Sequence, residues 1–558
     1  MALGYQESID EVTGPGSWFE VEDGVVNGVP MKVFKNAPVA LRDMFNPSRE
    51  SDATYMVYED EEWSFKKTHQ EADALAYALV HTYGIKPGDH VGISMRNLPE
   101  WAIAFTAITG IGAVSVSMNS WWTEEELEFS LKDVGLSILI VDSERIERAT
   151  GPCERNGTKM ITVREGNVAV PAIAKRWDDV VVRGEAMPFV EITTDMDAII
   201  LFTSGTTGFP KGAVSTHQAV ANSMMAFSAR ASANGKRTEG TPEEKPASPF
   251  PNVGILAVPL FHVTGMAVML SNFAYQFKMV IMFKWDAERA LQLIEKHHIT
   301  TFTGVPTQSW DLVQHPNFSK YDTSSLNVVG GGGAPAPAKL VEQVDGAFKS
   351  GKPNLSYGMT ETNAYGPGNV GIEYTSQPNS TGRTPLPGME VEIRDEDAHP
   401  VPCNTSGEIW MKGPMLIRGY WNRPDANKET IVNGWLRTGD LGRIDDDGFL
   451  FIEDRAKDMI IRGGDNVYGA EVETGIYEIP EVYEAAVFGI KHERLGEEVA
   501  CVIMTKPGMT LTEEQVTTFL NGRMAKYKIP TRIAFTTDPL PRNPAGKFLK
   551  RSMEKLYF

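Results

Sequence analysis

The segment Leu201-Phe-Thr-Ser-Gly-Thr-Thr-Gly-Phe-Pro-Lys-Gly-Ala213 is the most informative part of this chain. Its start overlaps the apolar run 197–202 (DAIILF), which is typical of a buried strand. Glycines let backbone N–H groups approach an anion closely, hydroxyl groups donate hydrogen bonds, and a lysine adds positive charge. The segment therefore predicts a strand that leads into a loop that binds a polyphosphate.

This loop differs from the Walker A phosphate loop. In that motif Gly-Lys is followed by Ser or Thr, whereas Lys211 lies between Pro210 and Gly212. The 201–213 segment instead resembles the phosphate loop of the adenylate-forming superfamily, which includes acyl-CoA synthetases, peptide-synthetase adenylation domains and luciferases. A flexible surface loop is the other interpretation of this composition, so the rest of the chain has to decide.

Composition excludes several classes of protein. The chain has 558 residues, of which 42% are hydrophobic, and about 150 residues per domain suggests roughly two to four domains. A net charge of −20, with no block dense in Lys and Arg, argues against a nucleic-acid partner. The 3 cysteines are far apart, which argues against a disulfide framework or a zinc site and favours a reducing compartment.

The start of the chain shows neither the basic stretch nor the apolar stretch of a signal peptide. No run approaches the roughly 18 apolar residues of a membrane helix. We therefore expect a cytoplasmic protein without stable membrane insertion. The oligomeric state stays open, with a homodimer among the candidates.

Strand-like and helix-like segments alternate along the chain, which indicates an α/β fold with largely buried sheets. Expected strands cover 89–95, 137–142, 279–283 and 300–303, and expected helices cover 101–111 and the stretch from the N-cap Asp286 to 297. Residues 231–251 are rich in Pro, Gly, Ser, Lys and Glu, which predicts a disordered surface loop.

The character of the chain changes near residues 455–458. An acidic turn at 445–448 and a strand-like run at 449–452 precede this point, and a new helix begins at about 468. We therefore expect an N-terminal domain at 1–454, a hinge at 455–458 and a C-terminal α+β domain at 459–558.

Five further segments extend the resemblance, because they occur in the order and at the approximate spacings of the superfamily. They are 330–335 (GGGGAP), 357–361 (YGMTE), 434–440 (GWLRTGD), 454–468 (DRAKDMIIRGGDNVY) and 540–547 (LPRNPAGK). The resemblance covers about residues 40–550. It implies a large N-terminal AMP-binding domain built of α/β subdomains and a small, mobile C-terminal lid.

The resemblance also implies where ATP and Mg²⁺ bind. An aromatic ring can stack on adenine, a hydroxyl can bond a phosphate, and a carboxylate can hold Mg²⁺. By this resemblance Tyr357 packs on adenine, Thr360 contacts the α-phosphate and Glu361 ligates Mg²⁺. The glycines before 333 border the acyl pocket. The other predicted nucleotide contacts are Thr203, Ser204, Gly205, Thr206, Thr207, Gly208, Lys211, Gly333, Ala334, Pro335, Gly358 and Met359.

The later segments supply the ribose contacts, the hinge and the catalytic lysine. An ionised carboxylate only accepts hydrogen bonds, so Asp440 suits a ribose diol, and Arg455 matches the family's second ribose contact. Lys457 matches the hinge position, where many relatives carry Asp. Gly464 matches a position that lines the pantetheine tunnel. Lys547 matches the lysine that reaches the α-phosphate and the substrate carboxylate, and it is the expected catalytic cation.

The resemblance implies two half-reactions. A carboxylate attacks the α-phosphate of Mg-ATP and releases pyrophosphate. The lid then rotates, and the thiol of coenzyme A attacks the acyl-adenylate. Because both reactants of the first step are anions, positioning and charge neutralisation must carry the catalysis.

One residue narrows the substrate. Domains that activate α-amino acids usually carry Asp where this chain has His262, and a neutral imidazole cannot hold an ammonium group. A carboxylic acid without an α-amine is therefore expected, and Lys284 lies where coumarate-type ligases contact CoA. We favour a medium- to long-chain fatty acid, with an aryl or phenylpropenoic acid as the alternative. A second hypothesis is transfer of the acyl group to a carrier protein, and a third is a nucleotide sensor without turnover.

Overall fold

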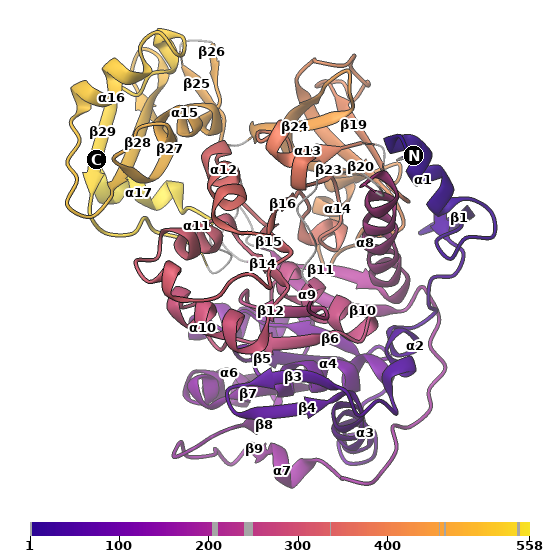
Figure 1. Ribbon diagram of the computed structural model, residues 1–558. Helices are drawn as coiled ribbons and strands as arrows, with labels where there is room; N and C mark the ends of the chain where they lie inside the picture. Colours follow the sequence, from indigo (N-terminus) through magenta and orange to yellow (C-terminus); the bar gives the residue numbers. More distant parts are fainter. Residues whose placement is uncertain are drawn as a thin grey trace.

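The computed structural model describes residues 3–203, 210–238, 249–334, 336–384, 386–456, 458–462, 465–543 and 547–558. The α/β fold class is confirmed. A large N-terminal domain carries a smaller C-terminal domain, drawn in light orange and yellow in Figure 1. We call this smaller domain the lid.

The first large sheet has eight strands and contains the start of the 201–213 segment. Its central strands are buried on both faces, as expected for parallel strands covered by helices. The register pairs Thr203 with Lys211, so the described ends of the 201–213 segment lie side by side. In spatial order the strands are β21 (Gly419–Tyr420), β11 (Lys211–Thr216), β10 (Asp197–Thr203), β6 (Val114–Ser117), β5 (His90–Ser94), β7 (Ile138–Asp142), β8 (Lys159–Val163) and β9 (Ala174–Arg176).

The second large sheet also has eight strands. Val258 and Met282 each follow a strand of this second sheet. Asn97, which follows β5 of the first sheet, donates to their carbonyl oxygens at 3.0 Å and 3.2 Å. This side chain therefore ties the ends of the two sheets together. In spatial order the strands are β17 (Gly368–Val370), β16 (Lys352–Ser356), β15 (Val328–Gly332), β14 (Thr301–Gly304), β12 (Val253–Leu256), β13 (Lys278–Ile281), β3 (Thr54–Tyr58) and β4 (Glu61–Ser64).

The main hydrophobic core lies between these two sheets. Every residue of α4 is buried, which matches a helix that is apolar on all sides. The side chains of Trp101 and Phe105 on this helix belong to the same cluster as Leu256 and Met279 from the second sheet. The helices of the N-terminal domain are α1 (Tyr5–Thr13), α2 (Leu41–Phe45), α3 (Phe65–His81), α4 (Pro99–Gly110), α5 (Glu124–Val134), α6 (Ile146–Asn156), α7 (Trp177–Val180), α8 (His217–Thr238), α9 (Val263–Ala274), α10 (Ala287–His297), α11 (Pro306–Gln314), α12 (Ala338–Ala347), α13 (Gly371–Ser376) and α14 (Pro424–Thr430).

A third sheet, which is antiparallel, completes the N-terminal domain and pairs Asp440 with Arg455. Its strands are β18 (Gly382–Arg383), β24 (Phe449–Arg455), β23 (Trp435–Ile444), β20 (Gly407–Lys412) and β19 (Glu390–Arg394), with β22 (Ile431–Val432) paired to β23. A separate hairpin joins β1 (Val21–Val26) to β2 (Val29–Phe34).

The lid has its own sheet and its own hydrophobic core, built around Ile460, Val472 and Ile503. Its strands are β26 (Asp465–Val467), β25 (Ile460–Arg462), β28 (Gly496–Thr505), β27 (Val482–His492) and β29 (Arg532–Thr536). Its helices are α15 (Gly469–Tyr477), α16 (Glu513–Leu520) and α17 (Lys550–Tyr557). The expected boundary at 455–458 stays a prediction; it begins at Arg455, the last residue of β24, and ends shortly before β25 begins at Ile460.

Most of the elements expected from the sequence are present with small shifts at their ends. The side chain of Asp286 caps α10 by accepting from the N–H of Arg289 at 2.7 Å, as expected. The prediction of a loop from residue 231 was wrong for its first part, because α8 continues to Thr238. Packing against α1 stabilises this end, where Ala233 is buried and Lys236 pairs with Glu11 at 3.0 Å. Residues 239–248 lie outside the described ranges.

Among the helices of the described residues, none combines the length and apolar character required to cross a bilayer.

Candidate active site

A cavity of about 1430 Å³ lies between the N-terminal domain and the lid. The predicted site residues on its wall are Thr203, Lys211, His262, Lys284, Gly333, Gly358, Met359, Thr360, Glu361, Asp440, Arg455 and Lys547. Most of the predicted site residues that the structure describes therefore meet in one place, although they are spread over more than 300 residues of sequence.

Four of the six segments lie partly outside the described residues. Among the predicted site residues, this applies to Ser204, Gly205, Thr206, Thr207 and Gly208 of the first segment, to Pro335, and to Lys457 and Gly464 near the expected hinge. Their predicted roles stay predictions.

The glycines at 330–333 have two different roles. A Cβ on Gly331 would lie 2.0 Å from the carbonyl oxygen of Gly304, so the close approach of β15 to its neighbouring strand requires glycine there. Only Gly333 lines the large cavity, and a Cβ there would have its nearest neighbours at 3.8 Å, on Thr264 and Val305. Ala334 is not part of the cavity wall.

The 357–361 segment brings a hydroxyl and a carboxylate to the cavity. A Cβ on Gly358 would meet the carbonyl oxygen of Ala364 at 2.2 Å, so this tight turn admits only glycine. Thr360 and Glu361 then start a short 3₁₀ helix, Thr360–Thr362. The carboxylate of Glu361 is buried and accepts a hydrogen bond of 2.5 Å from the hydroxyl of Tyr420.

Asp440 is the centre of a second polar group on the wall. The hydroxyl of Tyr357 donates to its Oδ2 at 2.6 Å, and Nε of Arg455 lies 3.2 Å from its Oδ1. Burial, and secondly the negative charge of Asp440, raises the pKa of Tyr357 well above its usual value, so its hydroxyl is a donor. Tyr357 itself does not line the cavity; its role against adenine stays a prediction.

His262 lies at the start of α9 and is held there by the main chain. Its N–H donates to the carbonyl oxygen of Pro259 at 3.1 Å, and its carbonyl oxygen accepts from the N–H of Met266 at 3.0 Å. Burial and, to a lesser degree, the positive charge of Lys547 lower the pKa of His262 to about 4, so the imidazole is neutral near pH 7. Its Nε2 is buried, and among the described residues it has no hydrogen-bond partner.

Lys547 belongs to the lid and lines the cavity, and its backbone bonds to the described segment 540–543, which we call the strap. The N–H of Asn543 donates to the carbonyl oxygen of Lys547 at 2.8 Å, and the Asn543 side chain accepts from the N–H of Lys547 at 3.0 Å. Arg542 donates to Glu484 of β27 at 2.8 Å, which anchors the strap to the lid sheet. The backbone of Lys547 is therefore fixed independently of its side chain.

A polar contact joins the lid to the N-terminal domain beside the cavity. The hydroxyl of Tyr483 on β27 donates to Oδ1 of Asp311 on α11 at 3.1 Å. Nε1 of Trp285 donates to the other oxygen, Oδ2, at 2.9 Å. Figure 1 shows β27 and α11 on facing sides of the boundary between the two domains. This contact favours the lid orientation in which Lys547 is at the cavity.

The metal-binding capacity of the site is small on the protein side. Within the described ranges, no cluster of three or more His, Cys, Asp or Glu side chains could hold a metal ion. Mg²⁺ is commonly held by one or two carboxylates together with substrate phosphates. Glu361, one of the buried carboxylates on the cavity wall, fits that arrangement.

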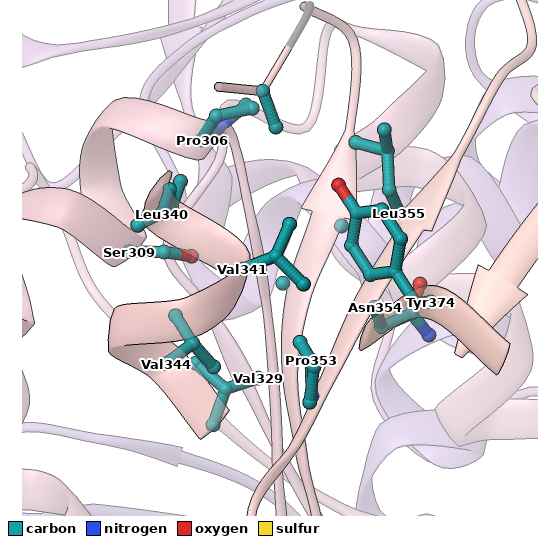
Figure 2. Close-up of a pocket in the computed structure, with 13 residues that line it drawn as sticks. Pro306, Ser309, Val329, Leu340, Val341, Val344, Pro353, Asn354, Leu355 and Tyr374 are labelled. Carbon is teal, nitrogen blue, oxygen red and sulfur yellow. The ribbon is translucent and has the colours of Figure 1, made fainter. Parts of the chain in front are cut away.

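A second cavity is too small for any substrate. Figure 2 shows it beside α12, lined by side chains such as Val341 and Leu355, with a volume of about 20 Å³. The hydroxyls of Ser309 and Tyr374 on its wall are buried, and neither has a hydrogen-bond partner in the described structure. The space is sufficient for a single water molecule. Gly330 and Gly331 line this small space and not the large cavity.

The geometry agrees with comparisons to known proteins. The profile described as AMP-binding enzyme matches residues 45–421, and the profile described as AMP-binding enzyme C-terminal domain matches residues 471–547. The chain belongs to the AMP-binding enzyme family. The predicted superfamily and the predicted enzyme class, acid–thiol ligase, are thereby confirmed.

Two curated members of the AMP-binding family show how close the relation is. The long-chain-fatty-acid–CoA ligase FadD13 of Mycobacterium tuberculosis is 30% identical over 498 residues, which cover 88% of this chain and 93% of the relative. A 2-succinylbenzoate–CoA ligase of Bacillus mycoides is 32% identical over 507 residues, 90% of this chain and 96% of the relative. The crystal structure of ATP-bound MatB from Rhodopseudomonas palustris matches with a TM-score of 0.80 and 28% identity, over 92% of this chain and 98% of that one.

Two contacts in the site were not found from the sequence. Tyr420 contacts Glu361, which is 59 residues away in the sequence, and Tyr483 contacts Asp311, which is 172 residues away. Tyr483 lies in an ordinary strand-like run that offers no signal. Tyr420 lies in the short segment 418–422 (RGYWN), whose glycine and adjacent aromatic residues break the alternating pattern and are the one available signal.

Proposed function

We propose that this protein is an ATP-dependent carboxylic acid–CoA ligase that forms an acyl-adenylate and pyrophosphate and then an acyl-CoA thioester. The observation that carries the proposal is the single cavity shared by the lid lysine Lys547, the carboxylates Glu361 and Asp440, and the neutral His262. AMP-binding CoA ligases use ATP, Mg²⁺ and CoA, and relatives of this chain have been solved with ATP or AMP.

The nucleotide would lie along one side of the cavity. Asp440 would accept hydrogen bonds from the ribose hydroxyls, with Arg455 beside it, and the 357–361 segment would lie against the adenine and the α-phosphate. Lys211, at the start of β11, would hold the phosphates that leave as pyrophosphate. Lys211, Thr360 and Asp440 all line the cavity, which supports this arrangement of the nucleotide.

Glu361 would hold Mg²⁺, which when bound neutralises phosphate charge. The chain's own contribution to the adenylation step is Lys547, whose ammonium group would be placed between the α-phosphate and the attacking carboxylate. A preorganised cation of this kind acts most strongly where water is excluded. The strap around Asn543 gives Lys547 that preorganisation.

For the second half-reaction we propose that the lid, 459–558, rotates relative to the N-terminal domain, 1–454, about a hinge at 455–458 that contains Lys457. Rotation would remove Lys547 and open a path for the CoA thiol along Gly464 and Lys284. Lys284 supports a CoA contact, because it lines the cavity and, among the described residues, has no ion-pair partner. A carrier protein's phosphopantetheine is the alternative thiol.

The acid is a medium- to long-chain fatty acid in this proposal. The neutral His262 gives no counter-charge for an α-ammonium group, and apolar side chains of Val258, Phe261 and Val305 line the cavity. FadD13, a long-chain-fatty-acid–CoA ligase, supports this choice. The relatives named as 2-succinylbenzoate–CoA ligases, at a similar identity, keep an aryl acid as the second candidate.

A pyrophosphate-release screen tests the proposal. Purified protein with Mg-ATP is given short, medium, long and aromatic carboxylic acids, first with CoA and then with a holo-carrier protein. We expect release with an apolar acid and CoA, together with an acyl-CoA product detected by mass spectrometry. No release with any acid would refute the ligase proposal and favour a sensor. If product formed on the carrier protein but not on CoA, the thiol acceptor would be the carrier's phosphopantetheine.

A further inference from the structure

Tyr420 is placed at the junction of two predicted phosphate-site elements. Its strand β21 pairs antiparallel with β11, the strand that begins at Lys211. The neighbouring main-chain groups extend this connection, since the N–H of Ile417 donates to the carbonyl oxygen of Glu361 at 3.0 Å. The strand β21 and the residues just before it therefore contact both the lysine and the carboxylate segments.

The position of Tyr420 is fixed from both sides of its backbone. Asn427 accepts from its N–H at 2.6 Å and donates to its carbonyl oxygen at 3.0 Å. The side chain is only 9% exposed, and that exposure is toward the large cavity, of whose wall it forms part. The ring therefore has little freedom to follow a moving partner, and its partners have to adapt to it.

The side chain of Tyr420 touches both functional groups at once. Its hydroxyl donates to Oε1 of Glu361 at 2.5 Å, and Nζ of Lys211 lies 5.4 Å from its ring centre, within cation–π range. Among the described residues, the other carboxylate oxygen of Glu361 has no hydrogen-bond partner.

We propose that Tyr420 is a positioning residue that fixes the carboxylate of Glu361 with one oxygen directed to the metal and couples it to the phosphate-binding Lys211. The inference rests on the proposed function, because it takes the roles of Glu361 and Lys211 from it. Without the hydroxyl, a buried carboxylate loses its donor and takes other rotamers. Both changes weaken it as a ligand for a divalent cation.

The test is the variant Tyr420→Phe, which keeps the ring and removes only the hydroxyl. The matched control is Tyr55→Phe, since Tyr55 is fully buried and its hydroxyl donates at 3.2 Å to the main chain of Met269, in the core. Calorimetry measures binding of α,β-methylene-ATP at a series of Mg²⁺ concentrations. Pyrophosphate release is measured over the same series, and thermal denaturation without ligand reports folding.

We expect Tyr420→Phe to need about tenfold more Mg²⁺ for half-saturation in both assays, the scale of one hydrogen bond to a charged group. Nucleotide binding without Mg²⁺ should be unchanged, as should the Mg²⁺ dependence of the control. Replacing Tyr420 with Leu should in addition weaken Mg²⁺-independent binding, because Lys211 loses the ring.

An Mg²⁺ dependence of Tyr420→Phe equal to that of the wild type would overturn the inference, and so would an equal shift in the control. A failure of the proposed function is distinguishable from both results. In that case the wild-type protein would release no pyrophosphate, while its Mg²⁺-dependent binding of the nucleotide analogue would still report on Tyr420.

Discussion

Replacement of Lys547 by Ala removes the one lid cation that we place at the reacting groups. The strap around it is held by main-chain bonds to Asn543 and by the ion pair between Arg542 and Glu484, none of which uses the lysine side chain. The substitution therefore removes a charge and leaves the strap in place. Lys555→Ala, on an exposed position of α17 in the same domain, is the matched control.

The magnitude follows from the role of the charge. Loss of one preorganised partner of transition-state charge costs about 10²–10³ in rate, or roughly 3–4 kcal/mol. Lys547 is close enough to His262 to lower the pKa of that histidine. The charge of Lys547 therefore lies on the side of the cavity where we propose that the carboxylic acid binds. We therefore expect Lys547→Ala to lower the rate of adenylation by about 10²–10³-fold, and the pKa of His262 to rise.

Two assays separate the half-reactions. Pyrophosphate release reports adenylation, and acyl-CoA formation from supplied acyl-adenylate reports the second step, in which we propose that the lysine has moved away. The second step should lose much less than the first. Equal losses in both steps would refute the assignment, and so would normal pyrophosphate release. NMR titration of His262 checks the electrostatic contact independently of turnover.

Three further predictions concern the nucleotide, the lid and the pH response. Asp440→Asn should raise the KM for ATP about tenfold in steady-state kinetics, because a charged acceptor is worth about 1.5–3 kcal/mol; an unchanged KM would remove Asp440 from the ribose site. Tyr483→Phe should lower pyrophosphate release by about two- to fivefold, since it removes a partly exposed hydrogen bond to Asp311 worth roughly 0.5–1 kcal/mol, and thioester formation from supplied acyl-adenylate should not slow. Burial lowers the pKa of His217 to about 4, against about 6.5 unfolded, so the unfolded state binds the proton first and the free energy of unfolding should fall as pH falls from 6.5 toward 4. Urea denaturation at pH 7 and pH 5 measures this slope, which should be smaller in His217→Asn; an identical slope would contradict it.

The sequence predicted the family, the fold class and several of the segments that line the cavity, because those features depend on short local patterns. A glycine such as Gly358 is needed where the chain approaches its own backbone, and the YGMTE segment records that need in five adjacent residues. The N-cap Asp286 was readable for the same reason, since a cap bonds to an N–H three residues away.

The contacts missed from the sequence join residues that no local pattern connects. Glu361 and Tyr420 meet because β21 pairs with β11, and Asp311 and Tyr483 meet because two domains face each other. The loop prediction for 231–238 failed in a related way. Its composition is polar, but a neighbouring helix covers Ala233 and stabilises two more turns of α8.

The substrate depends on different residues from those that identify the family. Relatives named as a long-chain-fatty-acid–CoA ligase and a 2-succinylbenzoate–CoA ligase are 30% and 32% identical to this chain, so overall similarity does not discriminate between these acids. In our proposal the nucleotide side, with Lys211, Glu361 and Asp440, would serve the same ATP chemistry for either acid. Discrimination must come from the wall next to His262, where Gly333 leaves open space toward Thr264 and Val305. An acid that fills this space buries apolar surface, and each Å² of it contributes about 25 cal/mol to binding. The pyrophosphate screen compares acids that differ in this contribution.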